Sequence, residues 1–387
     1  MKKSIIDITE NRLAKTYAKF PIEVADGYGS TVLSADGKEY IDLGGGCGVN
    51  ILGMKNKMWL DAVEAQLRRT AFCSNLFYNA PAALLAEQLC VRTKMQRVFF
   101  SNSGAEANET AIKAARKYAS EKKGAEFTDI ITLKMSFHGR TVTALSATGQ
   151  PDMQCGFAPL TAGFYYIDDD EEQLRQALSD RKVAAIMIEL IRGEGGVLPA
   201  SRGFIRAAAQ AAKKDDILLI VDEVQTGVGR CGALFGYEKY DIIPDIITTA
   251  KGLGGGLPIG ATIFGEKTCD ILQKGQHGST FGSNPLSCAA ASAVLKQIDD
   301  ELLNEVNKKS EYIFSRLQGQ NGIKSISGMG LMIGVETEKN ADEVLDCCIK
   351  NGVVAIKAKH KIRLLPALNI PWEQLKQAID ILIYACK

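Results

Sequence analysis

Two side chains that could act together on one cofactor stand at the ends of two predicted strands. The apolar run 218–221 (LLIV) stops at Asp222, and the β-prone run 245–250 (DIITTA) stops at Lys251, which a glycine cluster follows. A carboxylate can keep the ring nitrogen of a pyridine-type cofactor protonated, and a lysine can form a Schiff base with the cofactor aldehyde. The same pattern also fits two buried strands with ordinary charged ends, and this stretch alone favours neither interpretation.

A third candidate feature is the turn after the short predicted strand 98–100 (VFF). Small and polar residues occupy 101–109, a helical pattern covers 110–123, and Ser103 and Glu106 stand in the positions of a capping box. Free N–H groups and the positive dipole at the start of such a helix form an anion site, although most turns of this kind bind nothing. The turn matches neither the phosphate loop of nucleotide hydrolases nor a dinucleotide fingerprint, so neither function is supported.

Aromatic and charged residues follow two further predicted strands. One loop holds Phe137, His138 and Arg140. These could stack on a ring and bind a carboxylate, or they could be a core phenylalanine beside solvated polar groups. Glu189 ends a fully apolar strand, and Glu194 follows it in a glycine-rich turn.

The order of the predicted elements indicates the fold class. Strands are expected at 98–100, 129–133, 183–190, 218–221 and 245–250, and helices at 110–123, 170–180 and 202–214. Near-continuous apolar strands that alternate with helices are typical of a mostly parallel α/β sheet covered on both faces, and such sheets bind ligands at the carboxyl ends of their strands. The candidate residues at or just after these ends are Ser103, His138, Glu189, Asp222 and Lys251. Their shared position favours one common site more strongly than any single residue does.

The two ends of the chain are expected to differ from this central part. The predicted elements there are a helix within 1–20, a hairpin over 32–43 turning at Asp36-Gly37, helices at 57–70, 81–94, 285–299 and 301–317, strands at 323–336 and 353–365, a helix at 341–351 and a closing helix from 371. The glycine-rich segment 44–48 is either a flexible linker or a place where backbone approaches a ligand. We expect residues 1–45 to join a small α+β domain, 46–285 to form a large domain, and 286–387 to form the small domain.

Composition excludes several classes of protein. Of 387 residues, 46% are hydrophobic and 24% charged, which is enough for a sizeable core, and the net charge of +1 gives no indication of nucleic-acid or membrane binding. No apolar run approaches the roughly 20 residues of a membrane span, and residues 1–13 lack the apolar segment of a secretory signal. The ten cysteines show no C-x-x-C spacing. We therefore expect no metal site and reduced thiols in the cytoplasm.

Six motifs resemble those of one enzyme family. They are SNSGAEANETAIKAARKY at 101–118, FHGRT at 137–141, GEGG at 193–196, VDEVQTGVGRCG at 221–232, TTAKGLGGGLPIGA at 248–261 and HGSTFGSNPL at 277–286. Their types and order are similar to those of class III (subgroup II) aminotransferases, and the resemblance covers essentially the whole chain. It implies the α/β fold of pyridoxal-phosphate (PLP)-dependent transferases of fold type I, a mostly parallel sheet in a large domain with a smaller α+β domain, and pyridoxal 5'-phosphate as the cofactor.

Within this class the chain is most similar to members that act on N2-acetyl-L-ornithine. The support is the compact length, the opening segment 16–46, and FHGRT followed by SATGQ at 146–150. The implied ping-pong reaction moves the δ-amino group to 2-oxoglutarate and gives N-acetyl-L-glutamate 5-semialdehyde and glutamate, a step of arginine biosynthesis.

The resemblance also implies a role for each matched residue. Lys251 would bind the cofactor aldehyde and then move protons, and Asp222 would hold the proton on the ring nitrogen. The remaining cofactor contacts would be Ser103, Gly104 and Ala105 at the phosphate and Phe137, His138, Glu189 and Gln225 around the ring. Thr280 would reach the phosphate of the neighbouring subunit, so the implied active form is a homodimer with shared active sites.

Charged residues in matched positions imply how the substrates bind. Arg363 would bind the α-carboxylate of glutamate or 2-oxoglutarate, and Glu194 would pair with it when an ω-amine is the donor. Arg140 would hold the distal carboxylate, and Ser279 belongs to the same substrate-binding set. Two arginines suit a dicarboxylate because bidentate arginine–carboxylate contacts are strong and selective. Each arginine alone would more commonly be a surface charge.

Two positions depart from the family pattern. Met54-Lys55 stand after Gly53 where many relatives carry a histidine, and Arg192 stands where a neutral residue is commoner. Arg192 would either add a cation near the substrate opening or be solvated. The sequence leaves open another ω-aminotransferase acting on 4-aminobutyrate, ornithine, succinylornithine or succinyl-diaminopimelate, an aminomutase, and a non-enzymatic relative. Intact Lys251 and Asp222 argue against the last of these.

Overall fold

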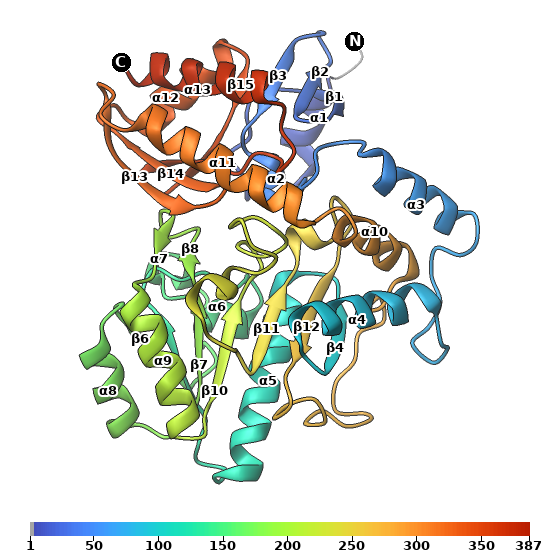
Figure 1. Cartoon of the computed structure of the whole chain (residues 1–387), viewed down its shortest axis with the longest axis vertical. Coiled ribbons are helices and arrows are strands. Elements are labelled where there is room, and N and C mark those ends of the chain that lie inside the picture. Colours follow the sequence, from blue (N-terminus) through green and yellow to red (C-terminus); the bar gives the residue numbers. More distant parts are fainter. Residues whose placement is uncertain (1–3) are drawn as a thin grey trace.

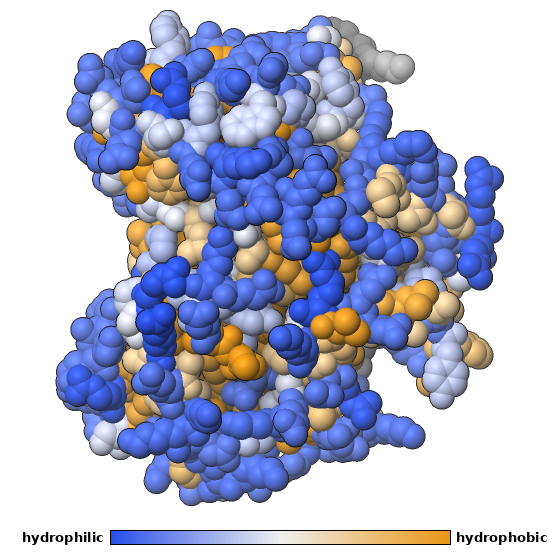
Figure 2. Space-filling view, viewed as in Figure 1, coloured by the Kyte–Doolittle hydropathy of each residue, from blue (hydrophilic) through white to orange (hydrophobic). Residues whose placement is uncertain are grey.

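The chain folds into a lower part built on one large sheet and an upper part that combines both ends of the chain (Figure 1). The computed structural model describes residues 4–387. Figure 2 shows a mostly hydrophilic face that is hollowed between the two parts, with hydrophobic side chains in the hollow. No helix within the described residues is long and apolar enough to cross a membrane.

The lower part contains a seven-stranded sheet of order β4-β12-β11-β10-β7-β5-β6. Its strands are β4 (Arg97–Ser101), β5 (Asp129–Leu133), β6 (Phe164–Ile167), β7 (Val183–Glu189), β10 (Leu218–Asp222), β11 (Ile246–Thr249) and β12 (Gly260–Phe264). β5, β6, β7, β10 and β11 pair in parallel, whereas β12 runs antiparallel to both β11 and β4. The expected mostly parallel sheet is confirmed, although β6 and β12 were not predicted.

Alternating residues of the central strands face two different layers of helices. Leu218 and Ile220 of β10 pack in a cluster with α5 (Gly104–Lys122), whereas Leu219 and Val221 pack in a cluster that includes α8 (Glu171–Asp180) and α9 (Arg202–Lys214). Successive side chains of a strand point to opposite faces, so a sheet covered on both sides requires an unbroken apolar run. The apolar run that ends at Asp222 is therefore explained by burial on both faces.

The upper part is built from segments far apart in the sequence. Its elements from the start of the chain are α1 (Ile5–Arg12), β1 (Val24–Tyr28), β2 (Thr31–Ser34) and β3 (Glu39–Asp42), and those from the end are α11 (Asp300–Leu317), β13 (Ile323–Met329), β14 (Met332–Thr337), α12 (Ala341–Lys350), β15 (Val353–Val354), β16 (Ile356–Ala358), β17 (Lys361–Leu364) and α13 (Trp372–Cys386). β3 pairs in parallel with β15, which joins the N-terminal hairpin to the C-terminal unit. The domain boundaries at 45 and 285 stay a prediction.

Several expected boundaries in the flanking parts are wrong. Residues 323–336 form the antiparallel pair β13 and β14 rather than one strand, because Gly330 at φ 58° lets the chain reverse between them. Residues 353–365 form three short strands rather than one. Helix α5 begins at Gly104, directly after the predicted cap Ser103 and before the helical pattern at 110–123, whereas α10 (Pro285–Leu295) ends earlier than the expected residue 299.

The remaining elements are short or surround the sheet. They are α2 (Gly45–Gly48), α3 (Lys57–Leu67), α4 (Ala80–Thr93), α6 (Val142–Ala147), α7 (Pro151–Gln154), β8 (Ile191–Arg192), β9 (Leu198–Pro199) and the 3-10 turns Gly236–Tyr240 and Lys251–Leu253. The 44–48 segment is a tight turn rather than a linker. A Cβ atom added to Gly45 would lie 2.3 Å from the carbonyl oxygen of Leu365, so this glycine is required against backbone of the upper part.

Candidate active site

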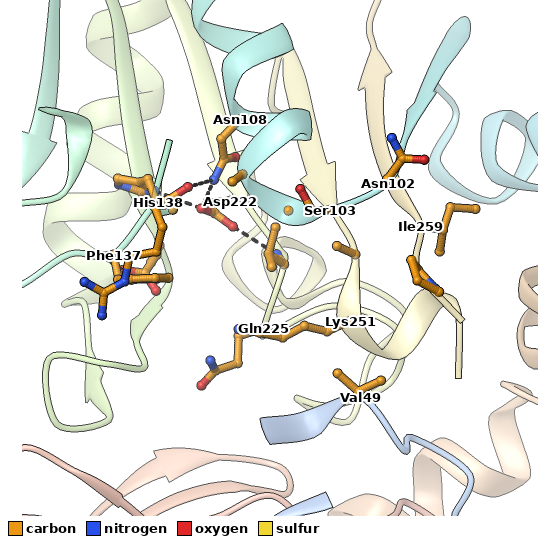
Figure 3. Close-up of a pocket in the computed structure, with 18 of the residues that line it drawn as sticks. Val49, Asn102, Ser103, Asn108, Phe137, His138, Asp222, Gln225, Lys251 and Ile259 are labelled. Atoms are coloured by element: carbon orange, nitrogen blue, oxygen red, sulfur yellow. Dashed lines mark hydrogen bonds and ion pairs between the residues drawn. The ribbon is translucent and has the colours of Figure 1, made fainter. Parts of the chain in front are cut away.

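The predicted strand-end residues surround one cavity of about 440 Å³ (Figure 3). Those that line it are Ser103, Gly104, Ala105, Phe137, His138, Arg140, Glu189, Asp222, Gln225 and Lys251. They come from the carboxyl ends of β4, β5, β7, β10 and β11, where a mostly parallel sheet is expected to bind ligands. Glu194, Ser279, Thr280 and Arg363 do not line this cavity.

Asp222 ends β10 and is only 4% exposed. Its Oδ2 atom accepts hydrogen bonds from Nδ2 of Asn108 and from Nδ1 of His138, each at 2.8 Å, and its Oδ1 accepts from the backbone N–H of Val224 at 3.0 Å (Figure 3). A carboxylate only accepts, so the Nδ1 atom of His138 carries a proton. Three donors therefore hold the carboxylate in one orientation at the cavity wall.

Asn108 is a site residue that the sequence pattern did not predict. It lies in the second turn of α5, and its Nδ2 also donates to the backbone carbonyl of His138 at 2.7 Å. Its Oδ1 accepts from the hydroxyl of Thr248 at 2.7 Å, which fixes the orientation of the amide. A usable signal was the position of Asn108 inside the SNSGAEANE motif, one helical turn after the predicted anion site.

Lys251 follows β11 at the opposite wall of the cavity. Its backbone φ of 40° is in the left-handed region, which a residue with a side chain adopts at a cost and which is common at functional sites. Burial lowers the pKa of the Lys251 amine, while Glu194 raises it and Arg363 lowers it further. The amine is therefore easier to deprotonate than that of a solvated lysine, as a proton-transferring group requires.

The start of α5 forms the third wall of the cavity. The hydroxyl of Ser103 accepts from the backbone N–H of Glu106 at 3.2 Å and so caps the helix. Gly104 and Ala105 supply the first N–H groups of the helix, which have no partner within a helix and suit an anion. A Cβ atom on Gly104 would lie 2.6 Å from Cγ1 of Val224, so the helix begins directly against the chain that follows Asp222.

Glu189 supports the loop that carries the aromatic residue of the site. Its carboxylate accepts from the backbone N–H of Phe137 at 2.8 Å and of Gly193 at 3.4 Å. Burial raises the pKa of Glu189 to about 7, although His138 opposes this shift. The guanidinium of Arg140 lies 5.4 Å from the centre of the Phe137 ring, and both residues line the cavity.

Glu194, Gln225 and Arg363 form a linked group beside the cavity. Nη1 of Arg363 donates to Oε1 of Glu194 at 2.6 Å and to Oε1 of Gln225 at 3.2 Å. Burial alone would raise the pKa of Glu194, but the neighbouring Arg363 charge holds that pKa below its ordinary value. Gln225 lines the cavity, so it connects the ion pair between Arg363 of the upper part and Glu194 after β8 to the space above the sheet.

Ser279 and Thr280 lie at the edge of the site rather than in it. The hydroxyl of Ser279 accepts from Nδ2 of Asn102 at 3.2 Å, and Asn102 lines the cavity. Thr280 is exposed on the molecular surface. One subunit alone therefore does not bring Thr280 to its own cavity.

The two departures from the family pattern have structural explanations. Arg192 is 9% exposed and does not line the cavity. Its Nη1 donates to the carbonyl of Lys134 at 3.2 Å, and its Nη2 lies 3.9 Å from Oδ2 of Asp169. Arg192 is thus a buried link between strand ends, neither solvated nor a free cation at the substrate opening. Lys55 forms a surface ion pair with Asp26 at 2.5 Å.

Comparisons with known proteins agree with this geometry. The family model described as "Aminotransferase class-III" matches residues 13–386. The chain is 46% identical over 381 residues to the acetylornithine aminotransferase of Haemophilus ducreyi, covering 98% of this chain and 97% of that protein. The structure of N-acetylornithine aminotransferase from Stenotrophomonas maltophilia is 34% identical with a TM-score of 0.85, and the match covers 98% of each chain.

A third relative is the ornithine aminotransferase of Toxoplasma gondii. Its structure is 32% identical with a TM-score of 0.94, covers 99% of this chain and 94% of that chain, and shows partial occupancy of PLP at the active site. The chain belongs to the class III aminotransferase family. It is a pyridoxal-phosphate-dependent transaminase of fold type I, as the motifs predicted.

The residues of the cavity suit this cofactor. Asp222 would hold the proton on the ring nitrogen, Lys251 would bind the aldehyde, and the start of α5 would hold the phosphate. The buried Nε2 atom of His138 has no hydrogen-bond partner within residues 4–387, which leaves one polar atom beside the cavity for the bound group. Among these described residues, no cluster of acidic, cysteine and histidine side chains could hold a metal ion.

Proposed function

We propose that this aminotransferase moves the δ-amino group of N2-acetyl-L-ornithine to 2-oxoglutarate, giving N-acetyl-L-glutamate 5-semialdehyde and glutamate, a step of arginine biosynthesis. The observation that carries the proposal is the contact of Arg363 with both Glu194 and Gln225 beside the cavity. A paired arginine does not attract a second carboxylate, so an ω-amine can enter with Arg363 neutralised. When the acceptor binds, its α-carboxylate replaces Glu194 on the guanidinium.

The residues of the chain would divide the reaction between them. When bound, pyridoxal phosphate supplies an electron sink for the charge left by the broken C–H bond. The amine of Lys251, whose pKa burial lowers, would take the proton from the substrate carbon and pass it to the cofactor. Asp222, held by Asn108 and His138, keeps its carboxylate on the ring nitrogen. Arg140 binds the distal carboxylate of 2-oxoglutarate. Ser279 contributes to substrate binding at the edge of the site.

The amine-donor profile tests this proposal. The purified holoenzyme is mixed with each amine in the absence of acceptor, and the absorbance change of the cofactor gives the rate of the half-reaction. N2-acetyl-L-ornithine should react fastest, and 2-oxoglutarate should restore the starting spectrum. A holoenzyme that does not react with N2-acetyl-L-ornithine would contradict the proposal.

Ornithine is the second candidate donor. The fold of the Toxoplasma ornithine aminotransferase superposes with a TM-score of 0.94, above the 0.85 of the Stenotrophomonas N-acetylornithine enzyme. The two donors differ in the charge of the α-amino group, which acetylation removes. Comparison of both half-reactions at equal concentration decides between them.

We further propose that the active form is a homodimer with shared active sites. Thr280 is exposed and would reach the phosphate held by the neighbouring subunit. Leu76, Phe77 and Tyr78 are exposed apolar residues in the segment after α3, and hydrophobic side chains gather on this projection at the right of Figure 2. Exposed apolar patches mark interaction sites, and contact between two subunits would bury this one. Sedimentation of the purified protein measures its oligomeric state, and a monomer would contradict the proposal.

The location of the protein in the cytoplasm stays a prediction, which cell fractionation can test.

A further inference from the structure

His277 begins the segment that carries Ser279 and Thr280, and it docks this segment on α5. The ring is half-buried, its centre lies 4.7 Å from that of Phe99 on β4, and its two nitrogens contact Thr110 and Lys113 of α5. Nε2 lies 2.8 Å from the hydroxyl oxygen of Thr110, and Nδ1 lies 3.0 Å from Nζ of Lys113.

The hydrogen bonds around His277 determine its protonation. The single hydroxyl proton of Thr110 is donated to the carbonyl of Glu106 at 2.9 Å, so the Thr110 oxygen must accept from Nε2 of the ring. An ammonium group has only donors, so Nδ1 must accept from Lys113. The ring is therefore neutral, with its proton on Nε2. A second proton on Nδ1 would face the Lys113 ammonium and remove this hydrogen bond.

Few neighbouring charges could compensate a protonated ring. On α5, Lys113 opposes the added charge, and Glu109 is the acidic residue that favours it. Glu109 is itself engaged, because it accepts hydrogen bonds from Thr141 and from the backbone of Ala144. Arg97 on β4 lines the same small pocket as the ring and adds a positive charge there, and this guanidinium is paired with Asp270 at 3.1 Å.

We propose that neutral His277 is a positioning residue that fixes the start of the 277–283 segment on α5, and that protonation of His277 in mild acid releases the ring from α5, while Asn75 and Asn79 still hold the segment farther along. The effect of this protonation on cofactor affinity rests on the proposed function, in which Thr280 contacts the phosphate held by the neighbouring subunit. The segment that begins at His277 carries Ser279, which is linked to Asn102 of the cavity, and Thr280, assigned to the neighbouring phosphate, so a shift of its start changes how these two residues are placed. Cofactor affinity therefore becomes dependent on pH through a residue outside the cavity.

The direction of the titration agrees with this geometry. Burial, and then the Lys113 charge, lower the pKa of His277 below its ordinary value of 6.5. A released ring has the ordinary value, so below about pH 6.5 the released state binds more protons than the docked state. Docking is therefore complete above that pH and is lost progressively as the pH falls through the lowered value.

The test compares the full-length holoenzyme with two variants. His277→Gln keeps one donor and one acceptor at the same end of the side chain but cannot become charged. Lys113→Met keeps the histidine and removes the opposing charge. For each protein, the dissociation constant of pyridoxal phosphate is measured between pH 5 and 7.5, and the histidine C–H signals are followed by NMR. The titration is tractable because the chain has three histidines.

The expected results differ between the three proteins. In the unmodified enzyme His277 should titrate below pH 6.5, and affinity should fall as the pH decreases, by at most about tenfold per pH unit for one proton. His277→Gln should bind as tightly at pH 7.5 and lack this component, whereas Lys113→Met should weaken the dependence and raise the His277 midpoint. A ring that titrates at or above 6.5, or a His277→Gln variant with unchanged pH dependence, would overturn the proposal. If His277 titrates as expected in all proteins but cofactor affinity does not change with pH in any of them, the proposed contact of Thr280 with the neighbouring phosphate would be overturned, and the NMR titration would still report on the docking of the ring.

Discussion

Nδ1 of His138 and Oδ2 of Asp222 lie 2.8 Å apart inside the protein, although 84 positions of sequence separate them. The same Oδ2 atom accepts from Asn108, which comes from a different helix. A loop, a helix and a strand thus converge on one carboxylate. These donors fix the orientation of the carboxylate, and a carboxylate placed at the ring nitrogen of a pyridine-type cofactor can keep that nitrogen protonated.

Replacement of Asn108 by alanine should therefore slow catalysis more than it weakens cofactor binding. The variant removes one donor from Asp222 and leaves the hydroxyl of Thr248 without its acceptor. Hydrogen bonds to charged groups contribute about 1.5–3 kcal/mol, so kcat should fall about ten- to hundredfold. The measurement is kcat together with the dissociation constant of pyridoxal phosphate. Asn108→Asp serves as a second variant, because a negative charge beside Asp222 should impair the enzyme more than alanine does.

The convergence at Asp222 also separates what the sequence could predict from what it could not. The ends of strands can be predicted from the sequence because burial on both faces requires an unbroken apolar run. The run before Asp222 ends where the chain leaves the sheet. The partnership with Asn108 depends on how far α5 reaches across the sheet and on the rotation of that helix. Neither is encoded locally, so a residue 114 positions away was not connected with Asp222.

Two other predictions failed for the same kind of reason. A solvated or substrate-facing Arg192 was plausible from its neighbours, but the packing of strand ends brings the Lys134 carbonyl and Asp169 to it. Residues 323–336 have the composition of one long strand, and the reversal depends on one glycine at positive φ. The local sequence pattern predicts which residues form strands. Where a strand reverses, and which groups contact a charged side chain, depends on tertiary contacts.

Lys251→Ala should abolish transamination and leave the fold intact. The variant loses the amine that bonds to the cofactor aldehyde and moves the proton, so the yellow colour of the lysine-bound cofactor should be absent. The side chain lies at the cavity wall rather than in the core, and the melting temperature of the apoprotein should change by only a few degrees. Absorbance, activity and thermal melting measure these three properties. Turnover above about one part in a thousand would show that another group moves the proton.

Arg363→Ala should raise the KM for 2-oxoglutarate about ten- to hundredfold, because it removes a charged hydrogen-bond donor to the α-carboxylate. The rate of the half-reaction with N2-acetyl-L-ornithine should fall less, because Arg363 is paired with Glu194 at that stage and does not bind this substrate. Arg175→Ala is a matched control, because Arg175 is an exposed arginine that pairs with Glu172 on α8. Equal losses in both half-reactions would contradict selective binding of the acceptor by Arg363.

Glu194→Gln should favour the half-reaction with glutamate over the half-reaction with N2-acetyl-L-ornithine, the opposite of the effect expected for Arg363→Ala. The glutamine cannot neutralise Arg363, so the guanidinium becomes available to carboxylates throughout the cycle. The half-reaction with glutamate should accelerate relative to the one with N2-acetyl-L-ornithine. Rates of both, measured on the same preparation, give the ratio. A ratio equal to that of the unmodified enzyme would mean that the ion pair does not control access.

Glu223→Gln should stabilise the protein at alkaline pH relative to the unmodified chain. Glu223 is fully buried beside Asp222, accepts from the backbone N–H of Tyr237 at 2.7 Å and contacts the Thr226 hydroxyl. Burial raises the pKa of Glu223 from 4.5 to about 7. The folded state therefore binds more protons than the unfolded state between these values, and its stability falls as the pH rises through this window.

The uncharged amide removes that dependence at position 223. The difference in unfolding free energy between Glu223→Gln and the unmodified protein should grow by about 1–3 kcal/mol from pH 5 to pH 8, because one pKa unit corresponds to about 1.4 kcal/mol. Chemical denaturation of the apoprotein at several pH values measures this difference and avoids the contribution of bound cofactor. The comparison is made with Glu172→Gln, an exposed carboxylate on α8 for which no such growth is expected. A constant difference across this range would show that Glu223 is charged in the fold at pH 5, and that its hydrogen bonds outweigh its burial.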